Sequence, residues 1–179
     1  MSKPTDHRER GVRGMRPAGA FRDLDAPRVA AQVPLIREIT VGWGDCDPAQ
    51  IAYTANIPAW GLLAVEAWYK ACLGVNWYEI NLDHGVGTPF VSLGFDFVSP
   101  VTPRAPLLVS VYVERLGRSS LSHLVEARQE DAVCFYGRTT AAFVDANEMK
   151  AVAIPDNMRA SIEDYLARQG PLPEWKSRT

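Results

Sequence analysis

The segment 56–73 constrains the fold most, because it is apolar on almost every side. Asn56 is a good N-cap with a proline shortly after it, and Gly74 is a natural residue for a helix end, so the pattern predicts a helix. Its only charged residues are Glu66 and Lys70, an i,i+4 pair. A helix that is apolar nearly all round belongs in an interior, so the rest of the chain must wrap around it.

Strands surround this helix in the sequence. Residues 33–43 before it read as a strand with alternating faces. After it, residues 77–84 read as a short helix or loop, and strand-like patterns follow at 90–97, 107–115, 121–129, 133–144 and 150–154. The connections are too short for crossovers between parallel strands, so we expect antiparallel neighbours. A last helix is expected near 159–168.

This order of elements predicts an α+β fold of the hot-dog type. An antiparallel sheet of about five or six strands would curl around the long central helix. The folded body is expected at 33–170, with tails at 1–32 and 171–179. The first of these carries seven basic and four acidic residues, several Pro and Gly, and few large apolar residues. Such a composition predicts a flexible tail.

Composition and charge exclude several classes of protein. A formal net charge of −2 argues against a nucleic-acid binder, and no apolar run approaches the ~20 residues of a membrane span. Cys46, Cys72 and Cys134 are odd in number and widely spaced, which supports neither a disulfide framework nor a zinc site. The N-terminus has no apolar segment typical of a secretory signal, so a cytoplasmic protein without a metal is expected.

The densest group of unusual residues is the loop Gly42–Tyr53, which directly precedes the expected helix. Unpaired N–H groups and the dipole at a helix N-terminus stabilise negative charge, including an oxyanion that forms on a carbonyl. Asp47 beside such donors would be a nucleophile or general base, which suggests acyl transfer to water. A second interpretation is that Asp45 and Asp47 only cap the turn, and the residue pattern by itself favours it.

Other routes to catalysis have weaker support. The chain has no GxSxG elbow, and His7, His84 and His123 are isolated, which is more typical of structural or solvated histidines. Cys46 lies between two carboxylates that disfavour its thiolate. The glycine-rich segment 85–89 lacks the Gly-Lys-Ser/Thr ending of a phosphate-binding loop.

Four motifs, in order along 36–156, resemble the bacterial 4-hydroxybenzoyl-CoA thioesterase family of the hot-dog superfamily. The first is Gly44-Asp45-Cys46-Asp47-Pro48-Ala49, followed by Tyr53, Asn56 and Trp60. The others are Val86-Gly87-Thr88-Pro89-Phe90-Val91-Ser92, then Arg118-Ser119-Ser120-Leu121, and Glu148-Met149-Lys150-Ala151. The first motif is the most specific, and the others support it.

The resemblance implies roles for individual residues. Asp47 matches the catalytic carboxylate, and Thr54 matches the position that opens the central helix, whose backbone N–H polarises the thioester carbonyl. Thr88 and Trp77 match residues of the acyl pocket, with Thr88 contributed across a dimer interface. The remaining expected contacts to the acyl-CoA substrate are Tyr53, Trp60, Leu62, Arg118, Ser119, Ser120 and Lys150, the last four near the CoA nucleotide and its phosphates. A second interpretation of these last residues is a hairpin turn with solvated charges.

Two residues depart from the family pattern. Gln50 replaces a glycine next to the catalytic aspartate, and its side chain could orient water or substrate or signal altered chemistry. Leu62 replaces the carboxylate that holds the ring hydroxyl of 4-hydroxybenzoyl-CoA. An apolar side chain leaves that hydroxyl unpaired, at a cost of about 1–3 kcal/mol. The expected substrate is therefore a benzoyl-like or other apolar acyl-CoA.

Two other functions are compatible with this fold. A protein that binds acyl-CoA in its acyl pocket without hydrolysing it would be a sensor. A hot-dog dehydratase would need a His with a carboxylate, which is not evident here. A single curved sheet leaves a free edge, which a second subunit can cover. We therefore expect a homodimer or homotetramer.

Overall fold

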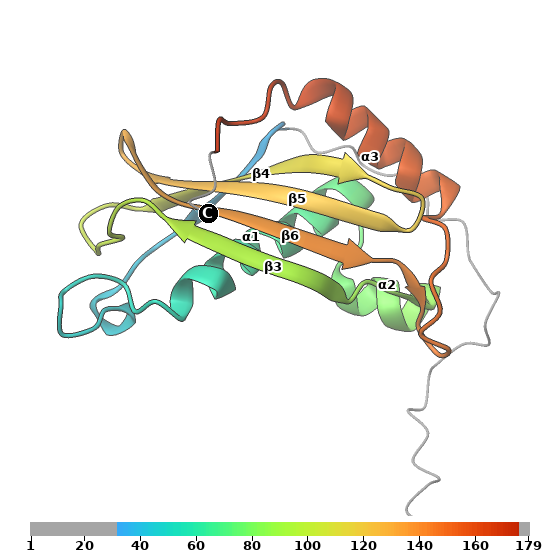
Figure 1. The fold of residues 1–179 in the computed structure, drawn as a ribbon, viewed down its shortest axis with the longest axis horizontal. Helices are drawn as coiled ribbons and strands as arrows, with labels where there is room; N and C mark the ends of the chain where they lie inside the picture. Colours follow the sequence, from blue (N-terminus) through green and yellow to red (C-terminus); the bar gives the residue numbers. More distant parts are fainter. Residues whose placement is uncertain (1–31, 176–179) are drawn as a thin grey trace, which may run out of the picture.

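The computed structural model describes residues 32–175, so the expected tail 1–32 lies outside the described residues except for residue 32, as do residues 176–179. Five antiparallel strands form one sheet in the order β1-β4-β5-β6-β3 (Figure 1). Their bounds are β1 Leu35–Ile39, β3 Phe90–Phe97, β4 Leu107–Leu116, β5 Ser120–Gln129 and β6 Ala132–Ala142. The predicted α+β fold and its antiparallel sheet are confirmed.

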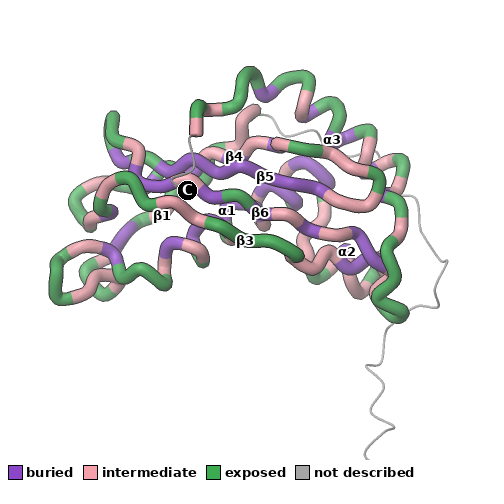
Figure 2. Tube along the Cα trace, in the orientation of Figure 1, coloured by how far each residue is buried: buried purple, intermediate pink, exposed green. Residues whose placement is uncertain are grey.

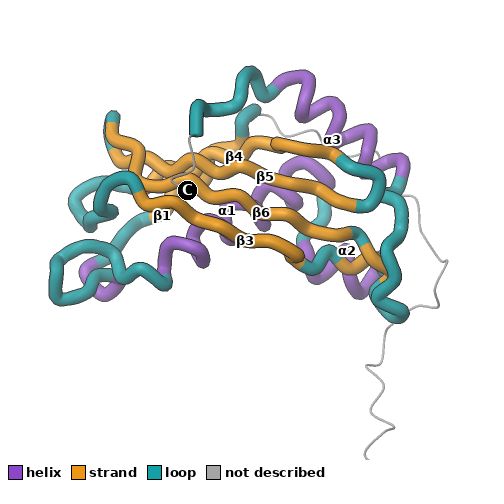
Figure 3. Tube along the Cα trace, in the orientation of Figure 1, coloured by secondary structure: helices purple, strands orange, loops and turns teal. Residues whose placement is uncertain are grey.

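Three α-helices accompany the sheet: α1 Asn56–Leu73, α2 Trp77–His84 and α3 Asp156–Arg168. Figures 1 and 3 show α1 behind the sheet and α3 along its upper border. A 3-10 turn, η2, covers Trp43–Asp45, and the two-residue strands β2 (Val86–Gly87) and β7 (Val144–Asp145) pair with each other. No helix of the described chain is long and apolar enough to span a membrane.

The core lies between α1 and the inner face of the sheet. Along β4 every second side chain from Leu107 to Val113 is fully buried, as the alternating pattern predicts. On α1, Trp68 and Tyr69 are fully buried as well. A Cβ atom on Gly61 of α1 would lie 2.6 Å from the ring of Phe95, so this glycine lets helix and sheet approach closely. One face of α1 is thus buried as predicted, whereas Leu63 outside that face is 50% exposed, so the helix is not enclosed on every side.

The two ends of α1 differ from the prediction in one respect. Gly74 ends the helix in the left-handed conformation with φ 75°, as expected. The N-cap, however, is Ala55, which makes no side-chain capping bond. Asn56 instead donates from Nδ2 to the backbone oxygen of Asp45 at 3.0 Å. The amide that could have capped the helix therefore ties the preceding loop to it.

The expected ion pair within α1 does not form. Lys70 contacts Glu79 of α2, with 3.1 Å between Nζ and Oε2. Glu79 is already fixed in place, because its carboxylate accepts from the backbone N–H of Asn76 at 2.8 Å in a capping box. Lys70 pairs with this oriented carboxylate of Glu79 and makes no ion pair with Glu66.

Two expected strands are shorter in the structure or missing. β1 ends at Ile39 because its partner β4 begins opposite it at Leu107. Residues 150–154 form no strand, and only an isolated bridge joins Ala151 to Val144. The N–H of Val152 still donates to the carbonyl of Phe143 at 2.9 Å, but that of Ile154 donates to the carbonyl of Arg118 at 2.8 Å, so the chain turns toward another partner there.

Tyr165 of α3 and Gln169, the residue that caps this helix, complete the hydrogen bonding of β4 where β1 is too short to do so. Tyr165 accepts from the N–H of Leu35 at 2.7 Å and donates to the carbonyl of Val111 at 2.6 Å. Gln169 accepts from the N–H of Val113 at 2.8 Å and donates to its carbonyl at 2.7 Å. The amide of Gln169 thus substitutes for a missing strand residue.

The expected C-terminal tail is anchored where the structure describes it, up to residue 175. The indole N–H of Trp175 donates to Asp96 of β3 at 2.8 Å. The ring stacks on Tyr136 at 6.0 Å between centroids, and the guanidinium of Arg138 lies 4.5 Å from the indole centre. These contacts hold the segment against the outer face of the sheet.

Candidate functional site

The loop before α1 holds both of its carboxylates by backbone hydrogen bonds. Asp45 accepts from the N–H of Gly42 at 2.8 Å, and Asp47 accepts through Oδ1 from the N–H of Ala49 at 2.8 Å. The backbone N–H of Asp47 in turn donates to the carbonyl of Ile51 at 2.9 Å. Both side chains therefore cap turns, as the second interpretation proposed. Asp47 is half-buried, and no hydrogen bond to its Oδ2 occurs within residues 32–175.

Gln50 adopts the left-handed conformation with φ 65°. Glycine enters this region without steric cost, whereas other residues rarely occupy it. The family that the loop resembles has a glycine at this position, and Gln50 occupies the backbone conformation that favours one, with an exposed polar side chain.

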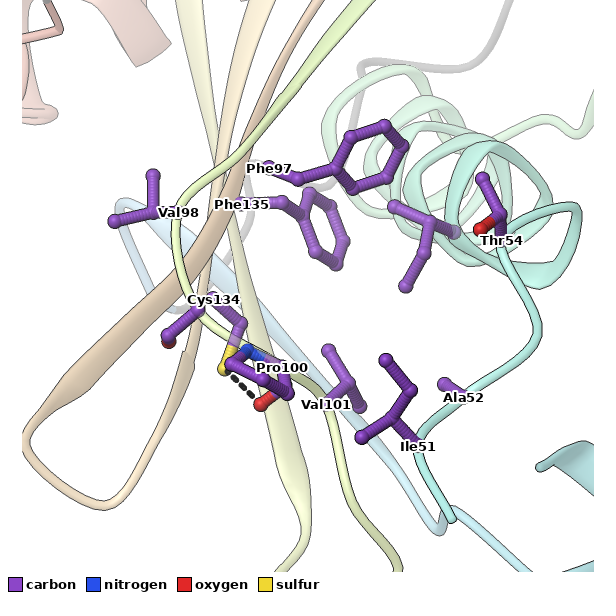
Figure 4. A pocket seen from close by; sticks show the side chains of 11 residues that line it. Ile51, Ala52, Thr54, Phe97, Val98, Pro100, Val101, Cys134 and Phe135 are labelled. Atoms are coloured by element: carbon purple, nitrogen blue, oxygen red, sulfur yellow. Dashed lines mark hydrogen bonds between the residues drawn. The ribbon is translucent and has the colours of Figure 1, made fainter. Parts of the chain in front are cut away.

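An apolar cavity of about 310 Å³ lies at the amino end of α1 (Figure 4). Its walls come from the loop and first turn of the helix, the end of β3 with the segment after it, and the start of β6. The lining residues are Ile51, Ala52, Thr54, Ile57, Phe97, Val98, Ser99, Pro100, Val101, Cys134 and Phe135. In Figure 4, Thr54 lies across the cavity from Val98 and Cys134. Asp47 precedes this wall by four residues and is not part of the lining.

A second recess, of about 680 Å³, lies between α1, α2 and the start of β3. It is lined by Glu66, Trp77, Tyr78, Asn81, Leu82, Gly87, Thr88, Pro89, Phe90 and Met149. Here the structure brings together Thr88 and Trp77, the two residues expected in the acyl pocket. Trp77 meets Phe90 edge to face with 5.4 Å between ring centroids, which fixes one wall.

The two cavities lie at opposite ends of β3. Phe97 at the end of this strand lines the cavity near Asp47, whereas Phe90 at its start lines the recess with Thr88. A strand of this length spans about 24 Å at ~3.4 Å per residue. One chain therefore does not bring Asp47 and Thr88 together.

The residues expected near CoA occupy two turns at the end of the sheet where the recess lies (Figure 1). Arg118 is exposed in the turn between β4 and β5, whose backbone is closed by a 2.8 Å bond from Gly117 to Ser120. The side chain of Arg159 reinforces this turn by donating to the carbonyl of Gly117 at 2.7 Å. Lys150 is exposed near Met149 and pairs with Glu148 at 2.8 Å.

The other expected contacts differ in accessibility. Tyr53 is exposed beside the loop, and Leu62 is half-buried on α1. Trp60 is buried in the core cluster, and its contact with the substrate stays a prediction. Glu66 was not predicted as a site residue, because its i,i+4 spacing from Lys70 indicated an ion pair on the helix. The structure places it in the lining of the recess.

Buried titratable groups in the core do not form a second reactive centre. His123 is fully buried against Trp68, 4.4 Å between ring centroids, and burial lowers its pKa to about 3. Burial also raises the pKa of the Cys72 thiol to about 12, which removes its thiolate at neutral pH. Within residues 32–175 no group of three or more His, Cys, Asp or Glu could hold a metal ion.

Comparison with known proteins decides the family. A family model described as the Thioesterase-like superfamily matches residues 41–162, which include the loop, α1 and both cavities. The chain belongs to the Thioesterase-like superfamily. No curated protein gives a match. A solved structure of a thioesterase-superfamily protein from Jannaschia sp. CCS1 is 42% identical, covers 79% of this chain and 97% of its own, and superposes with a TM-score of 0.70.

Two solved thioesterases share the fold at lower identity. A 1,4-dihydroxy-2-naphthoyl-CoA thioesterase from Synechocystis is 20% identical, with a TM-score of 0.66 over 72% of this chain and 95% of its own. A mutant 4-hydroxybenzoyl-CoA thioesterase complexed with 4-hydroxybenzoyl-CoA is 19% identical, with a TM-score of 0.65 over 72% and 97% of the two chains. These likenesses confirm the hot-dog thioesterase architecture of this superfamily member.

Proposed function

We propose that this member of the Thioesterase-like superfamily hydrolyses the CoA thioester of an aromatic, benzoyl-like acyl group in the cytoplasm. One observation carries the proposal: Asp47 is held by the N–H of Ala49 in the loop that leads into the N-terminus of α1. The hot-dog relatives that act on aromatic acyl-CoA thioesters support the substrate class. So does the resemblance of the loop to the 4-hydroxybenzoyl-CoA thioesterase family.

The working unit is a homodimer, and two such dimers can form a tetramer. β3 is an edge strand, largely exposed in Figure 2, and Val91 and Leu93 are 65% and 49% exposed. Antiparallel pairing of two β3 edges would remove this exposed surface. The pairing also brings the cavity near Asp47 of one subunit to Thr88 of the partner subunit. The shared centre then has the carboxylate, the helix N-terminus and the aromatic recess in one place.

The chemistry follows from these parts. Asp47 attacks the thioester carbonyl carbon or removes a proton from a water that attacks it. The N–H groups of Asn56 and Ile57 donate to the carbonyls of Tyr53 and Thr54, and Pro58 has none. The N–H of Ala55, directly after Thr54, is therefore the donor that would stabilise the negative charge on the carbonyl oxygen. The C–S bond breaks, sulfur leaves as the CoA thiolate and takes up a proton, and water supplies the oxygen of the product acid. In the nucleophilic route, water cleaves the intermediate anhydride and frees Asp47.

The CoA part is expected to lie over the two turns next to the recess. Arg118 and Lys150 are exposed there and offer positive charge to its phosphates. Ser119 and Ser120 provide polar groups of the same turn, and Tyr53 lies exposed beside the catalytic loop. Gln50, held at φ 65°, would direct its amide toward the water or the substrate.

Replacing Asp47 tests the proposal. Asp47→Asn retains the acceptor for the N–H of Ala49 and removes the charge, so the loop should persist while hydrolysis falls at least ~100-fold. Free thiol released from a panel of acyl-CoAs measures the rate. Asp45→Asn is the matched control, because its carboxylate caps the neighbouring turn, and it should retain most activity. Near wild-type rates in Asp47→Asn would remove this residue from the mechanism.

A non-catalytic acyl-CoA sensor is the second candidate. The observation that favours it is the engagement of Asp47 in a turn cap, which is a structural role in itself. The same assay separates the two functions. Tight binding of acyl-CoAs by calorimetry, without thiol release across the whole panel, would establish the sensor.

The acyl preference is tested at Leu62. Its apolar side chain cannot pair a para hydroxyl, so benzoyl-CoA should be preferred over 4-hydroxybenzoyl-CoA by about 5- to 100-fold in kcat/KM. Leu62→Asp should reduce or reverse that ratio. A strong preference of the unaltered protein for the 4-hydroxy substrate would contradict the prediction.

A further inference from the structure

Glu66 is a carboxylate without a partner in the wall of the recess. Lys70, its expected partner, is held by Glu79, and within residues 32–175 no hydrogen bond or ion pair involves the Glu66 side chain. The residue is half-buried on α1 and contributes to the lining. It is also the single charged side chain among the residues that line this recess.

The rest of the recess matches an aromatic ligand. Trp77, Tyr78 and Phe90 provide ring surfaces, while Thr88 and Asn81 provide neutral polar groups. Such walls suit a flat apolar ring and carry no positive charge that could neutralise the carboxylate of Glu66. A ligand that enters displaces water from Glu66, and an unpaired desolvated charge is costly. A favourable ligand must therefore bring its own hydrogen-bond donor to Glu66.

We propose that Glu66 selects aromatic acyl groups that carry a hydroxyl or amino donor away from the para position of the ring. The inference rests on the proposed function, since it takes the recess with Thr88 and Trp77 as the acyl pocket. Leu62 lies one helical turn before Glu66, about 5–6 Å along α1. Leu62, which the resemblance assigns to the para hydroxyl, is not part of the lining, whereas Glu66 is, so a donor that meets Glu66 stands at another position of the ring.

Matched substrates that differ by one substituent test this selection. The kcat/KM values of benzoyl-, 3-hydroxybenzoyl-, 3-aminobenzoyl- and 4-hydroxybenzoyl-CoA are measured by thiol release. Hydrogen bonds to a charged group are worth about 1.5–3 kcal/mol, so the wild type should prefer a meta donor over benzoyl by ~10- to 100-fold. In Glu66→Gln and Glu66→Leu this ratio should fall toward one, mainly through KM.

Two controls separate this inference from its premise. Glu174→Gln removes an exposed carboxylate that lies outside the recess and should leave every ratio unchanged. Dissociation constants of the same acyl-CoAs, measured by calorimetry, repeat the comparison independently of turnover. Equal ratios for wild type and both Glu66 variants would overturn the inference even with full hydrolysis. If no acyl-CoA is hydrolysed but the ratio of dissociation constants still depends on Glu66, the proposed reaction is overturned. The selection of substituents by Glu66 is then supported.

Discussion

The imidazole of His123 is fully buried in the core. Trp68 and Tyr69 of α1 pack against its ring, and Thr139 stands opposite it on β6. Within residues 32–175 neither ring nitrogen has a hydrogen-bond partner, and the Thr139 hydroxyl lacks one as well. Desolvation lowers the pKa of the His123 imidazole, so the folded protein contains its neutral form.

Stability should therefore fall on acidification. The pKa of His123 is about 3 in the folded chain and ~6.5 in an unfolded one, so the unfolded state takes up the proton first as pH falls. Its contribution is complete above about pH 6.5 and is lost at up to ~1.4 kcal/mol per pH unit as pH falls toward 3. Urea unfolding at pH 7.5 and 4.5 measures the loss. His123→Leu should show a shallower dependence, and an unchanged slope would contradict this account.

Single residues of the site could be predicted from the sequence only where a motif fixes their type. The pattern Asp-Pro-Ala identified the loop of Asp47, and the structure leaves its chemical role as a proposal. Glu66 escaped notice because helical spacing alone favoured Lys70 as its partner. The competing partner, Glu79, comes from a helix whose position depends on tertiary packing. The spacing of residues along one helix therefore does not determine which carboxylate Lys70 pairs with.

At the scale of elements, α1 was predicted nearly residue for residue, because its apolar pattern and Gly74 define it locally. The segment 150–154 was not, since whether an extended segment becomes a strand depends on a neighbour. Ala151 finds one bridge to Val144 and no more. The role of α3 in completing β4 through Tyr165 and Gln169 likewise arises from packing and leaves no pattern in the sequence.

The ring of Phe95 lies between α1 and the sheet, close to Gly61 and Gly137, and a substitution at Gly137 tests this contact. Phe95 packs against Gly137, where a Cβ would also lie 2.6 Å from Val125. Gly137→Ala should therefore lower the free energy of unfolding by about 1–3 kcal/mol through overpacking. The control is Gly94→Ala on β3, where a Cβ meets nothing within 4 Å. Chemical denaturation of both variants measures the difference, and equal losses would disprove overpacking.

At the scale of the molecule, the sequence indicated the members of the site but not their distance. Asp47 and Thr88 belong to motifs that precede and follow α1, and only the topology puts them at opposite ends of β3. Their separation in one chain is what makes a second subunit necessary for the proposed centre. A free edge was expected from a single curved sheet, and the structure shows that β3 lies at one edge and exposes Val91 and Leu93.

The proposed assembly predicts a link between oligomeric state and activity. Light scattering at micromolar concentration should give a dimer or tetramer. Leu93→Lys adds a charge to the exposed β3 edge, should shift the protein toward monomer and should abolish hydrolysis with the loss of pairing. The control Leu172→Lys changes an exposed leucine outside this edge. A fully active monomer would contradict the shared centre.

A strand whose two ends serve different centres has a genetic consequence. A chain with a defective Asp47 still has an intact Thr88, and a chain with a defective recess still has an intact Asp47. If the two kinds of chain are made together, mixed pairs contain one centre built wholly from undamaged halves. Alleles of these two types should therefore complement each other, whereas two alleles altered at the same end should not.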